Sequence, residues 1–285
     1  MTKSVLPKST VEARLDNIII NMEAPTARIT FNRPSKRNPL DWDTVRSLID
    51  LLEKIEASHD IEMVVFSGVG KAFSAGGDLA SYTGLIKSPE RFRSYLFDFN
   101  RLLNRIEKSE LIFIAAVQGY CVAGGLELVL ACDFCLAAEE AQFSDGHLNF
   151  GIIPGSGSSQ RLPRAVGSLR AKEMILTDRF ISGREAAQIG LANTCVPLSD
   201  LEQAISALIA KLSEKSFVGR KYSKYLVNEG LNGSLERGLQ MEMEYCHKYV
   251  TTNPDAIEGL TAFIEKRRPR FQARRDLCSD GDKHH

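Results

Sequence analysis

The amino-acid sequence predicts an α/β fold with a helical C-terminal third. Up to about residue 165, apolar runs of strand length alternate with segments whose apolar residues recur at helical spacing. This alternation is typical of a core in which helices cover sheets. Beyond residue 165 the strand patterns nearly vanish, whereas the helical patterns continue. No low-complexity linker intervenes, so we expect two intimately packed regions, 1–205 and 206–285.

Apolar periodicity and breaker residues define the expected elements. The expected strands are 14–21, 27–32, 61–66, 112–117 and 134–137. The expected helices of the α/β part are about 42–58, 92–106 and 125–131, and a glycine-rich loop is expected at 151–157. Six further helices are expected at about 168–176, 183–189, 198–213, 216–228, 233–250 and 254–266. The polar tail after Arg274 is expected to be disordered.

Two glycine-rich turns, 73–78 and 122–127, each follow an apolar run that is expected to be a buried strand. Glycine allows backbone N–H groups to approach a ligand without obstruction by a side chain. Two such turns can direct two N–H groups at one oxygen, as in an oxyanion hole. Ordinary turn chemistry remains the alternative, because single Gly-Gly pairs are common in turns.

Two titratable side chains at or beyond the second turn are candidates for chemistry. Glu127 lies in an apolar helical segment, where an ionised carboxylate is costly to bury unless it is paired. It is a candidate acid or base with a raised pKa, with a solvated residue or the partner of an arginine as alternatives. His147 follows Asp145, a carboxylate that can orient its ring or raise its pKa.

Charge and composition exclude several classes of partner. Lys and Arg total 36, as do Asp and Glu, so the net charge gives no case for binding nucleic acid or an anionic membrane. No apolar stretch is long enough for a transmembrane span, and the N-terminus lacks the apolar region of a signal peptide. We therefore expect a cytoplasmic protein whose six cysteines are reduced. Cys132 and Cys135 lack the second ligand pair of a zinc site, so no metal is expected.

A series of short motifs also runs through the chain in a fixed order. The motifs are NRP at 32–34, NPL at 38–40, KAFSAGGDL at 71–79, AAVQGY at 115–120, AGGLE at 123–127, ACD at 131–133, GIIPG at 151–155, QRL at 160–162 and FIEK at 263–266. In these motifs the chain resembles the crotonase, or enoyl-CoA hydratase/isomerase, superfamily over nearly its whole length. The resemblance implies a spiral core of β-β-α units, a helical C-terminal trimerisation region, and a homotrimer or a dimer of trimers.

The resemblance further implies an acyl-CoA thioester as substrate, with coenzyme A as part of the substrate and no separate cofactor. Matched position by position, the backbone amides of Gly77 and Gly124 form the oxyanion hole for the thioester oxygen. Glu127 matches the first catalytic glutamate of the hydratases. His147 occupies the position of their second glutamate, which is a departure from the family pattern.

Contacts with coenzyme A are expected at two basic clusters and along the first glycine turn. Lys36 precedes the NPL motif, where family members often meet the CoA phosphates, and Lys266 lies at the end of the last helix. Both clusters also fit solvated helix ends. Backbone atoms of the first turn are expected to meet the adenine and thioester regions. The expected contacts in this turn are Ala75, Gly77, Asp78 and Leu79.

The histidine at 147 leaves several reactions open. Hydration remains possible with Glu127 activating water and His147 supplying the α-proton, and double-bond isomerisation could use the same pair. Hydrolysis or decarboxylation of a β-dicarbonyl compound is a further alternative. Related hydrolases use an acidic residue after the Pro-Gly turn, where this chain has Ser156. A non-catalytic or RNA-binding relative is the remaining alternative, which neutral charge and the retained Glu127 disfavour.

Overall fold

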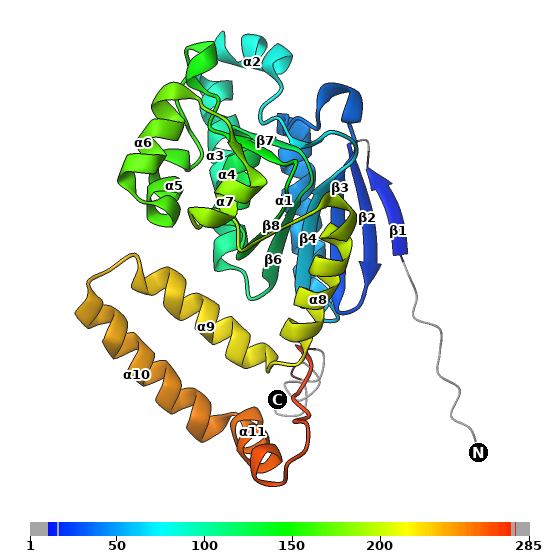
Figure 1. Ribbon diagram of the computed structural model, residues 1–285, viewed down its shortest axis with the longest axis vertical. Helices are drawn as coiled ribbons and strands as arrows, with labels where there is room; N and C mark the ends of the chain where they lie inside the picture. The colour runs from blue at the N-terminus through cyan, green and yellow to red at the C-terminus, as the bar shows by residue number, and fades with distance from the viewer. Residues whose placement is uncertain (1–10, 16, 275–276, 278–285) are drawn as a thin grey trace. The chain divides into compact units, whose positions relative to one another are not determined.

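The computed structural model describes residues 11–15, 17–274 and 277. The chain divides into two compact units, Met1–Ile205 and Ser206–His285 (Figure 1). Among the described residues, none of the helices combines the length and the apolar character that a membrane crossing requires. The tail after Arg274, for which the sequence predicts disorder, lies outside the described residues apart from residue 277.

Two sheets form the centre of the first unit in the described part of the chain. The strands of the larger sheet are, in spatial order, β1 (Val11–Leu15), β2 (Ile18–Glu23), β3 (Thr26–Phe31), β4 (Met63–Gly68), β6 (Ile112–Val117), β8 (Phe134–Ala138) and β11 (Thr194–Val196). Those of the smaller sheet are β10 (Ile181–Ser182), β9 (Gln142–Ser144), β7 (Tyr120–Val122) and β5 (Ala72–Ser74). The first three strands pair antiparallel, and from β3 to β11 every pairing in the larger sheet is parallel.

Helices follow the strands of the first unit and make up most of the second (Figure 1). Those of the first unit are α1 (Trp42–Ala57), α2 (Leu79–Ile86), α3 (Pro89–Lys108), α4 (Gly124–Ala131), α5 (Ser158–Val166), α6 (Ser168–Thr177) and α7 (Gly183–Gln188). The boundary between the units falls within α8 (Leu201–Ser213). The helices of the second unit are α9 (Phe217–Gly230), α10 (Leu235–Thr252) and α11 (Pro254–Ile264).

The strands after β3 come in consecutive pairs that alternate between the two sheets. In each of the pairs β4–β5, β6–β7 and β8–β9, the first strand joins the larger sheet and the second joins the smaller one. One or two helices follow each pair before the next begins. This repeat confirms the expected spiral of β-β-α units.

The smaller sheet brings three loops together. Its strand β5 pairs in parallel with β7 through Ser74 and Cys121, and β7 pairs in parallel with β9 through Val122 and Ser144. Parallel neighbours end at the same edge of a sheet, which is where ligands bind in open α/β folds. The loops after β5, β7 and β9 therefore lie side by side, although they are far apart in the sequence.

Aromatic residues from neighbouring strands pack in the core beside the larger sheet. The rings of Phe31 and Phe66 stack with centroids 6.1 Å apart, and Phe66 stacks on Phe113 at 6.0 Å. None of these side chains is more than 2% exposed. Burial of each ring contributes about 1.5–3 kcal/mol, so this stack helps to hold the strands that carry the loops.

Several sequence predictions of the first unit are wrong. The single strand expected over 14–21 is two antiparallel strands, β1 and β2, which pair from Leu15 and Ile18 outward. Strands β5, β7 and β9 were not expected, because three residues are too few to show alternation. Each glycine turn therefore follows one of these short strands rather than the long apolar run before it.

The region beyond residue 165 is also less uniform than expected. Its helices are confirmed, with ends within three residues of the predicted ones. However, strand β10 extends the smaller sheet and strand β11 extends the larger one, so strands do not end at residue 165.

Two helices of the first unit are also missing from the sequence prediction. They are α2, which is short and contains Gly84, and α5, which contains Pro163.

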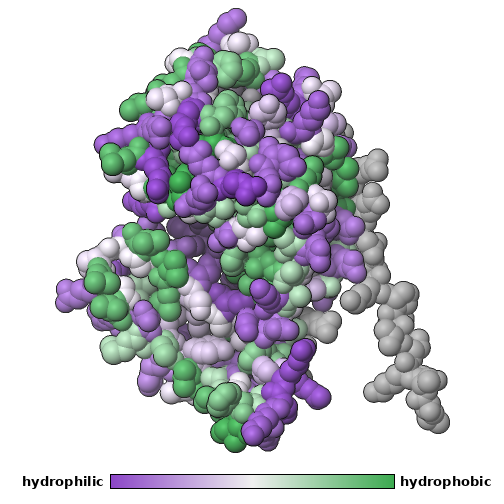
Figure 2. All heavy atoms as spheres, in the orientation of Figure 1, coloured by the Kyte–Doolittle hydropathy of each residue, from purple (hydrophilic) through white to green (hydrophobic). Residues whose placement is uncertain are grey.

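The second unit has few buried side chains and many exposed apolar ones. Its helices α9 and α10 pack through the ring of Tyr222, which lies edge-on to Tyr245 at 5.2 Å and to Tyr249 at 6.2 Å. Figure 2 shows apolar side chains on the visible face of these helices. The exposed apolar residues on α9–α11, and at the C-cap of α9, include Val227, Leu231, Leu235, Leu239, Met243, Ile257, Leu260, Phe263 and Ile264. Surfaces of this kind commonly contact another protein chain.

Candidate active site

The loops after β5, β7 and β9 surround one cavity of about 510 Å³. The loop after β5 contributes Gly77, helix α4 after β7 contributes Gly124 and Glu127, and the loop after β9 contributes His147. The remaining lining residues are Lys36, Arg37, Pro39, Ala75, Asp78, Leu79, Ala80, Tyr82, Tyr95, Phe99, Tyr120, Val122, Ala123, Gly146, Asn149, Phe150, Ile152 and Phe180. The four residues that the sequence singles out for chemistry therefore face a common space.

Backbone hydrogen bonds hold the first glycine turn against the segment before α1. The amide of Leu40 donates to the Gly76 carbonyl at 2.7 Å, and the amide of Ala75 donates to the Arg37 carbonyl at 2.9 Å. The Gly76 amide donates to the Ser74 hydroxyl at 3.1 Å. These contacts leave the next amide, that of Gly77, without a hydrogen-bond acceptor among the described residues.

The second glycine turn packs directly on the first. Gly76 has φ +84°, and a Cβ there would lie 2.8 Å from the Ala123 Cβ and 2.9 Å from the Gly124 nitrogen. Ala123 itself has φ +49° and ψ −119°, a conformation that costs about 1–3 kcal/mol for a residue with a side chain. This tight turn leads into the first turn of α4, where amides such as that of Gly124 have no carbonyl partner within the helix.

Glu127 is a buried carboxylate with one oxygen engaged. It is 2% exposed, and its Oε1 accepts hydrogen bonds from the amides of Ser156 at 2.8 Å and Ser158 at 3.2 Å. Burial raises the pKa of Glu127, although the His147 charge and the two amides oppose this effect. The remaining oxygen, Oε2, accepts neither of these two amide hydrogen bonds.

His147 is paired with a carboxylate on its own loop. Its Nδ1 lies 2.8 Å from Oδ1 of Asp145, which is completely buried. This hydrogen bond assigns a proton to Nδ1 and leaves Nε2 for chemistry. Burial acts to lower the pKa of His147, but Asp145, with help from Glu127 and Asp178, outweighs burial, and the pKa is raised.

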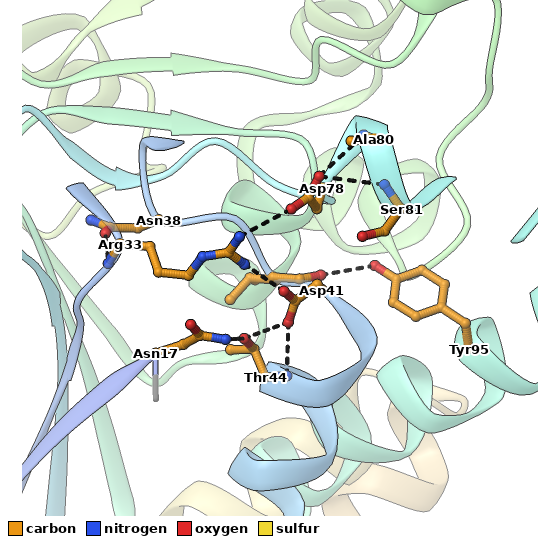
Figure 3. A network of polar contacts seen from close by, with 10 residues as sticks. Asn17, Arg33, Asn38, Asp41, Thr44, Asp78, Ala80, Ser81 and Tyr95 are labelled. Atoms are coloured by element: carbon orange, nitrogen blue, oxygen red, sulfur yellow. Dashed lines mark hydrogen bonds and ion pairs between the residues drawn. The ribbon is translucent and has the colours of Figure 1, made fainter. Parts of the chain in front are cut away.

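A network of polar side chains holds the first glycine turn against the neighbouring helices and strand (Figure 3). The guanidinium of Arg33 contacts the carboxylates of Asp41 and Asp78, which cap the N-termini of α1 and α2. In Figure 3 the Arg33 side chain lies between these two carboxylates. Asn38 adds amide hydrogen bonds to the carbonyls of Val69 at 3.0 Å and Ala72 at 2.7 Å. The network ties the turn to two helices and to strand β5.

Aromatic rings form the wall beside the two glycines. A Cβ on Gly77 would lie 2.7 Å from the Tyr82 ring, and one on Gly124 would lie 3.0 Å from the Phe99 ring. Tyr95 packs edge-on against Tyr82. Its hydroxyl donates a proton to the Leu40 carbonyl at 3.2 Å (Figure 3). Any side chain larger than hydrogen at either glycine would displace this wall.

The predicted contacts with coenzyme A fall in different places. Lys36, Ala75 and Leu79 line the cavity. Asp78 lines it too, but its carboxylate is occupied by Arg33 and by the Ala80 and Ser81 amides. Lys266 belongs to the second unit, shortly after α11, and is exposed. The structure thus places the predicted contacts of the first turn, and Lys36, at the cavity.

Sequence reasoning missed several residues of the site. Tyr82, Tyr95 and Asp178 carry no motif, and their roles depend on contacts with distant segments. The amides of Ser156 and Ser158 were missed because a backbone donor leaves no trace in side-chain identity. Within the described residues, no group of three or more His, Cys, Asp or Glu side chains is arranged to hold a metal ion.

Comparison with known proteins agrees over most of the chain. Residues 21–274 match the family model described as enoyl-CoA hydratase/isomerase. The chain is 34% identical to a crotonyl-CoA hydratase of Syntrophomonas wolfei, over 90% of this chain and 98% of that one. It is also 34% identical to a short-chain-enoyl-CoA hydratase of Clostridium acetobutylicum, over 89% and 97%.

Solved structures agree in fold. An enoyl-CoA hydratase from Bacillus anthracis superposes with a TM-score of 0.85 at 34% identity, and the match covers 90% of this chain and all of that one. An enoyl-CoA hydratase from Geobacillus kaustophilus superposes with a TM-score of 0.87 at 28% identity, covering 93% of this chain and all of that one. The chain therefore belongs to the enoyl-CoA hydratase/isomerase family of enzymes, within the crotonase superfamily, and an acyl-CoA thioester substrate fits this family.

Proposed function

We propose that the protein hydrates an α,β-unsaturated acyl-CoA thioester, with Glu127 as base and His147 as acid. The observation that carries this proposal is the common cavity lined by the Gly77 and Gly124 turns, a buried carboxylate and an Asp145-paired histidine. Its relatives named crotonyl-CoA hydratase and short-chain-enoyl-CoA hydratase support the same reaction.

The proposed reaction uses the two sides of the cavity together. The thioester oxygen accepts hydrogen bonds from the amides of Gly77 and Gly124, each worth about 3 kcal/mol of barrier in enzymes of this type. Oε2 of Glu127 takes a proton from water, whose oxygen bonds to the β-carbon. The electron pair of the double bond moves to give the enolate. His147 then donates the Nε2 proton to the α-carbon, which restores the thioester.

The first experiment incubates the purified protein with crotonyl-CoA and with longer and aromatic enoyl-CoA esters in D₂O. Hydration is expected to give the 3-hydroxyacyl-CoA with deuterium at the α-carbon, detected by mass spectrometry. Failure to detect hydration, isomerisation or α-proton exchange with any of these esters would contradict the assignment of the two side chains.

Double-bond isomerisation is a second outcome of the same assay. It needs a base and an acid near one enolate, which the pair Glu127 and His147 also supplies. A 3-enoyl-CoA substrate that rearranges faster than crotonyl-CoA is hydrated would favour this reaction. The product contains no added oxygen, so mass spectrometry separates the two reactions.

Cleavage of a β-dicarbonyl compound remains the alternative that the Asp145–His147 pair favours. An oriented histidine can activate water for attack on a carbonyl. Against this reaction, Ser156 stands where related hydrolases use an acidic residue, and its amide is already bonded to Glu127. Consumption of a β-diketone without coenzyme A would support cleavage over hydration.

We also propose that the chain assembles into a homotrimer or a dimer of trimers through the exposed apolar surface of α9–α11. The surface includes Leu239 and Phe263, which are 57% and 84% exposed. Burying such residues is favourable at about 25 cal/mol per Å². Light scattering of the wild type should give a multiple of the chain mass, and Phe263→Glu should lower it.

The cofactor and the basic contacts remain predictions. We expect full activity after treatment with a chelator, with coenzyme A entering only as part of the substrate. Lys36→Ala is expected to raise KM for the CoA ester more than it lowers kcat, because the side chain would contact phosphates away from the reacting carbons. Location in the cytoplasm likewise stays a prediction of the sequence.

A further inference from the structure

Asp178, at the C-terminal end of α6, contacts both sides of the loop that carries His147. Its Oδ2 accepts a hydrogen bond from the Asn149 amide at 2.5 Å, and its backbone carbonyl accepts one from the Ser144 hydroxyl at 2.9 Å. Ser144 ends strand β9, and Asn149 lies in the short 3-10 helix after His147. One residue of a distant helix end therefore holds the segment before the histidine and the segment after it.

The backbone of Asp178 adopts a conformation that usually belongs to glycine. Its φ is +50° and ψ +26°, the left-handed helical region that closes α6. Glycine is the common residue at this position of a helix end, and Asp and Asn are the usual exceptions. A glycine would end the helix equally well but would supply no carboxylate to the Asn149 amide.

The second carboxylate oxygen of Asp178 carries buried charge without a partner. Asp178 is 6% exposed, and its Oδ1 is buried with no hydrogen-bond partner among the described residues. The neighbouring cation, Arg179, contacts the carboxylates of Glu173 and Glu185 instead. The charge of Asp178 is therefore not neutralised by that neighbour.

Several charged groups face the His147 ring from different elements. Asp145 comes from the same loop, Glu127 from α4 and Asp178 from the end of α6, and all three favour the imidazolium. The basic residues that line the same cavity, Lys36 and Arg37, come from the segment before α1. Asp145 thus contacts the ring directly, whereas Glu127 and Asp178 act on it through their charges.

We propose that Asp178 is a positioning residue for His147, which holds the loop on both sides of the ring and adds a buried carboxylate to those of Asp145 and Glu127. Asp145 orients the ring by direct contact, whereas Asp178 acts through the Asn149 amide and through its charge. The catalytic role of the His147 proton rests on the proposed function. The contacts and the charge are independent of which reaction takes place.

Two substitutions separate the two effects of Asp178. Asp178→Asn tolerates the left-handed backbone and keeps an oxygen acceptor for the Asn149 amide, but it removes the charge. Asp178→Gly keeps the backbone without strain and removes both the acceptor and the charge. Glu173→Gln is the matched control, because it removes a half-exposed carboxylate from the same helix.

The main readout is the titration of His147 by NMR, which needs no substrate. Deuterated protein labelled at histidine Cε1 gives signals from the five histidines, and His147→Gln identifies the relevant one. In Asp178→Asn the midpoint of His147 should fall by about half a pH unit or more, the effect of removing one nearby buried charge. In Glu173→Gln it should stay unchanged. An unchanged midpoint in Asp178→Asn overturns the proposal.

Kinetics provide the second readout. With hydration active, the alkaline limb of kcat/KM should move to lower pH in Asp178→Asn, while kcat at low pH stays near that of the wild type. Asp178→Gly should show the same displacement and a kcat that is lower by about tenfold, the loss expected for one broken charged hydrogen bond. Equal kcat values for the two variants would overturn the proposal that Asp178 supports the His147 loop through the Asn149 amide. A displaced NMR midpoint without hydration activity keeps the inference and rejects the proposed reaction.

Discussion

The two sides of the cavity are built in different ways. The amide side consists of Gly77 and Gly124, whose positions follow from backbone hydrogen bonds and from contacts that leave no room for a Cβ. The side-chain side consists of Glu127 and His147, held by the amides of other loops and by a buried carboxylate. In the proposed mechanism the amide side would accept any thioester oxygen, so the choice of reaction would lie with the side-chain side.

The largest effect is expected when the side-chain side loses its base. Glu127→Gln keeps an oxygen for the amides of Ser156 and Ser158 but cannot take a proton. We expect kcat for hydration to fall by about 10³-fold, within the range for loss of a general base. Steady-state rates at saturating crotonyl-CoA measure the change, with Glu173→Gln as a surface control. A kcat within about threefold of wild type would contradict the role of Glu127 as base.

The amide side should respond to a single methyl group. Gly76→Ala places a Cβ 2.9 Å from the Gly124 nitrogen and adds a side chain at φ +84°, so the donor itself must move. We expect kcat to fall by about 10²–10³-fold, as for loss of one oxyanion donor. The free energy of unfolding should fall by about 1–2 kcal/mol, measured by urea denaturation.

Gly84→Ala is the control for this substitution. Gly84 lies in α2, where a Cβ would meet nothing within 4 Å. Activity should therefore be retained, and stability should rise by about 0.4–1 kcal/mol. Retained activity in Gly76→Ala would show that the contact between the two turns is dispensable.

The orientation of the histidine is expected to have an intermediate effect. Asp145→Asn replaces a charged acceptor of the His147 Nδ1–H by a neutral one, a change worth about 1.5–3 kcal/mol. We therefore expect kcat to fall by about 10–10²-fold, with a smaller change in KM. Asp200→Asn, at an exposed carboxylate, serves as control. An equal loss in both variants would point to a nonspecific charge effect.

The bracing network should affect stability more than turnover. Arg33→Gln removes the cation between Asp41 and Asp78, whose side chains are 17% and 11% exposed. Loss of these charged hydrogen bonds should lower the free energy of unfolding by about 1–3 kcal/mol. Thermal denaturation measures the loss. A kcat that falls as far as in Gly76→Ala would mean that the network is needed for the amide geometry itself.

The pH dependence of kcat/KM for the wild type should report the ionisation of Glu127 and His147, because the backbone amides of the other side do not titrate. The base must be ionised, and burial raises the pKa of Glu127. As the pH is lowered, activity should therefore begin to fall at a higher pH than it would with an ordinary carboxyl group as base. The acid must be protonated, and the pKa of His147 is raised, so activity should be lost as pH rises above the usual range of histidine. A kcat/KM profile without an alkaline limb would contradict His147 as the acid.

The amide side was predictable because its signal is local. Glycine at 76, 77, 124 and 125 reports directly that backbone must approach backbone or ligand, and the motifs around them place the family. The identities of Glu127 and His147 could also be read from the chain. The short strands β5, β7 and β9 that align these loops could not, because three residues carry no periodic pattern.

The sequence by itself determined the family, the helices of the C-terminal third, and the residues with chemistry to offer. Only the tertiary structure decided which of these residues share a cavity and what surrounds each of them. Asp178 and the amide of Ser156 are distant in sequence from the side chains they affect, and Arg33 acts through capping carboxylates of two helices. Burial, hydrogen bonding and neighbouring charges shift the pKa values of Glu127 and His147, and all three depend on segments that only the fold brings together.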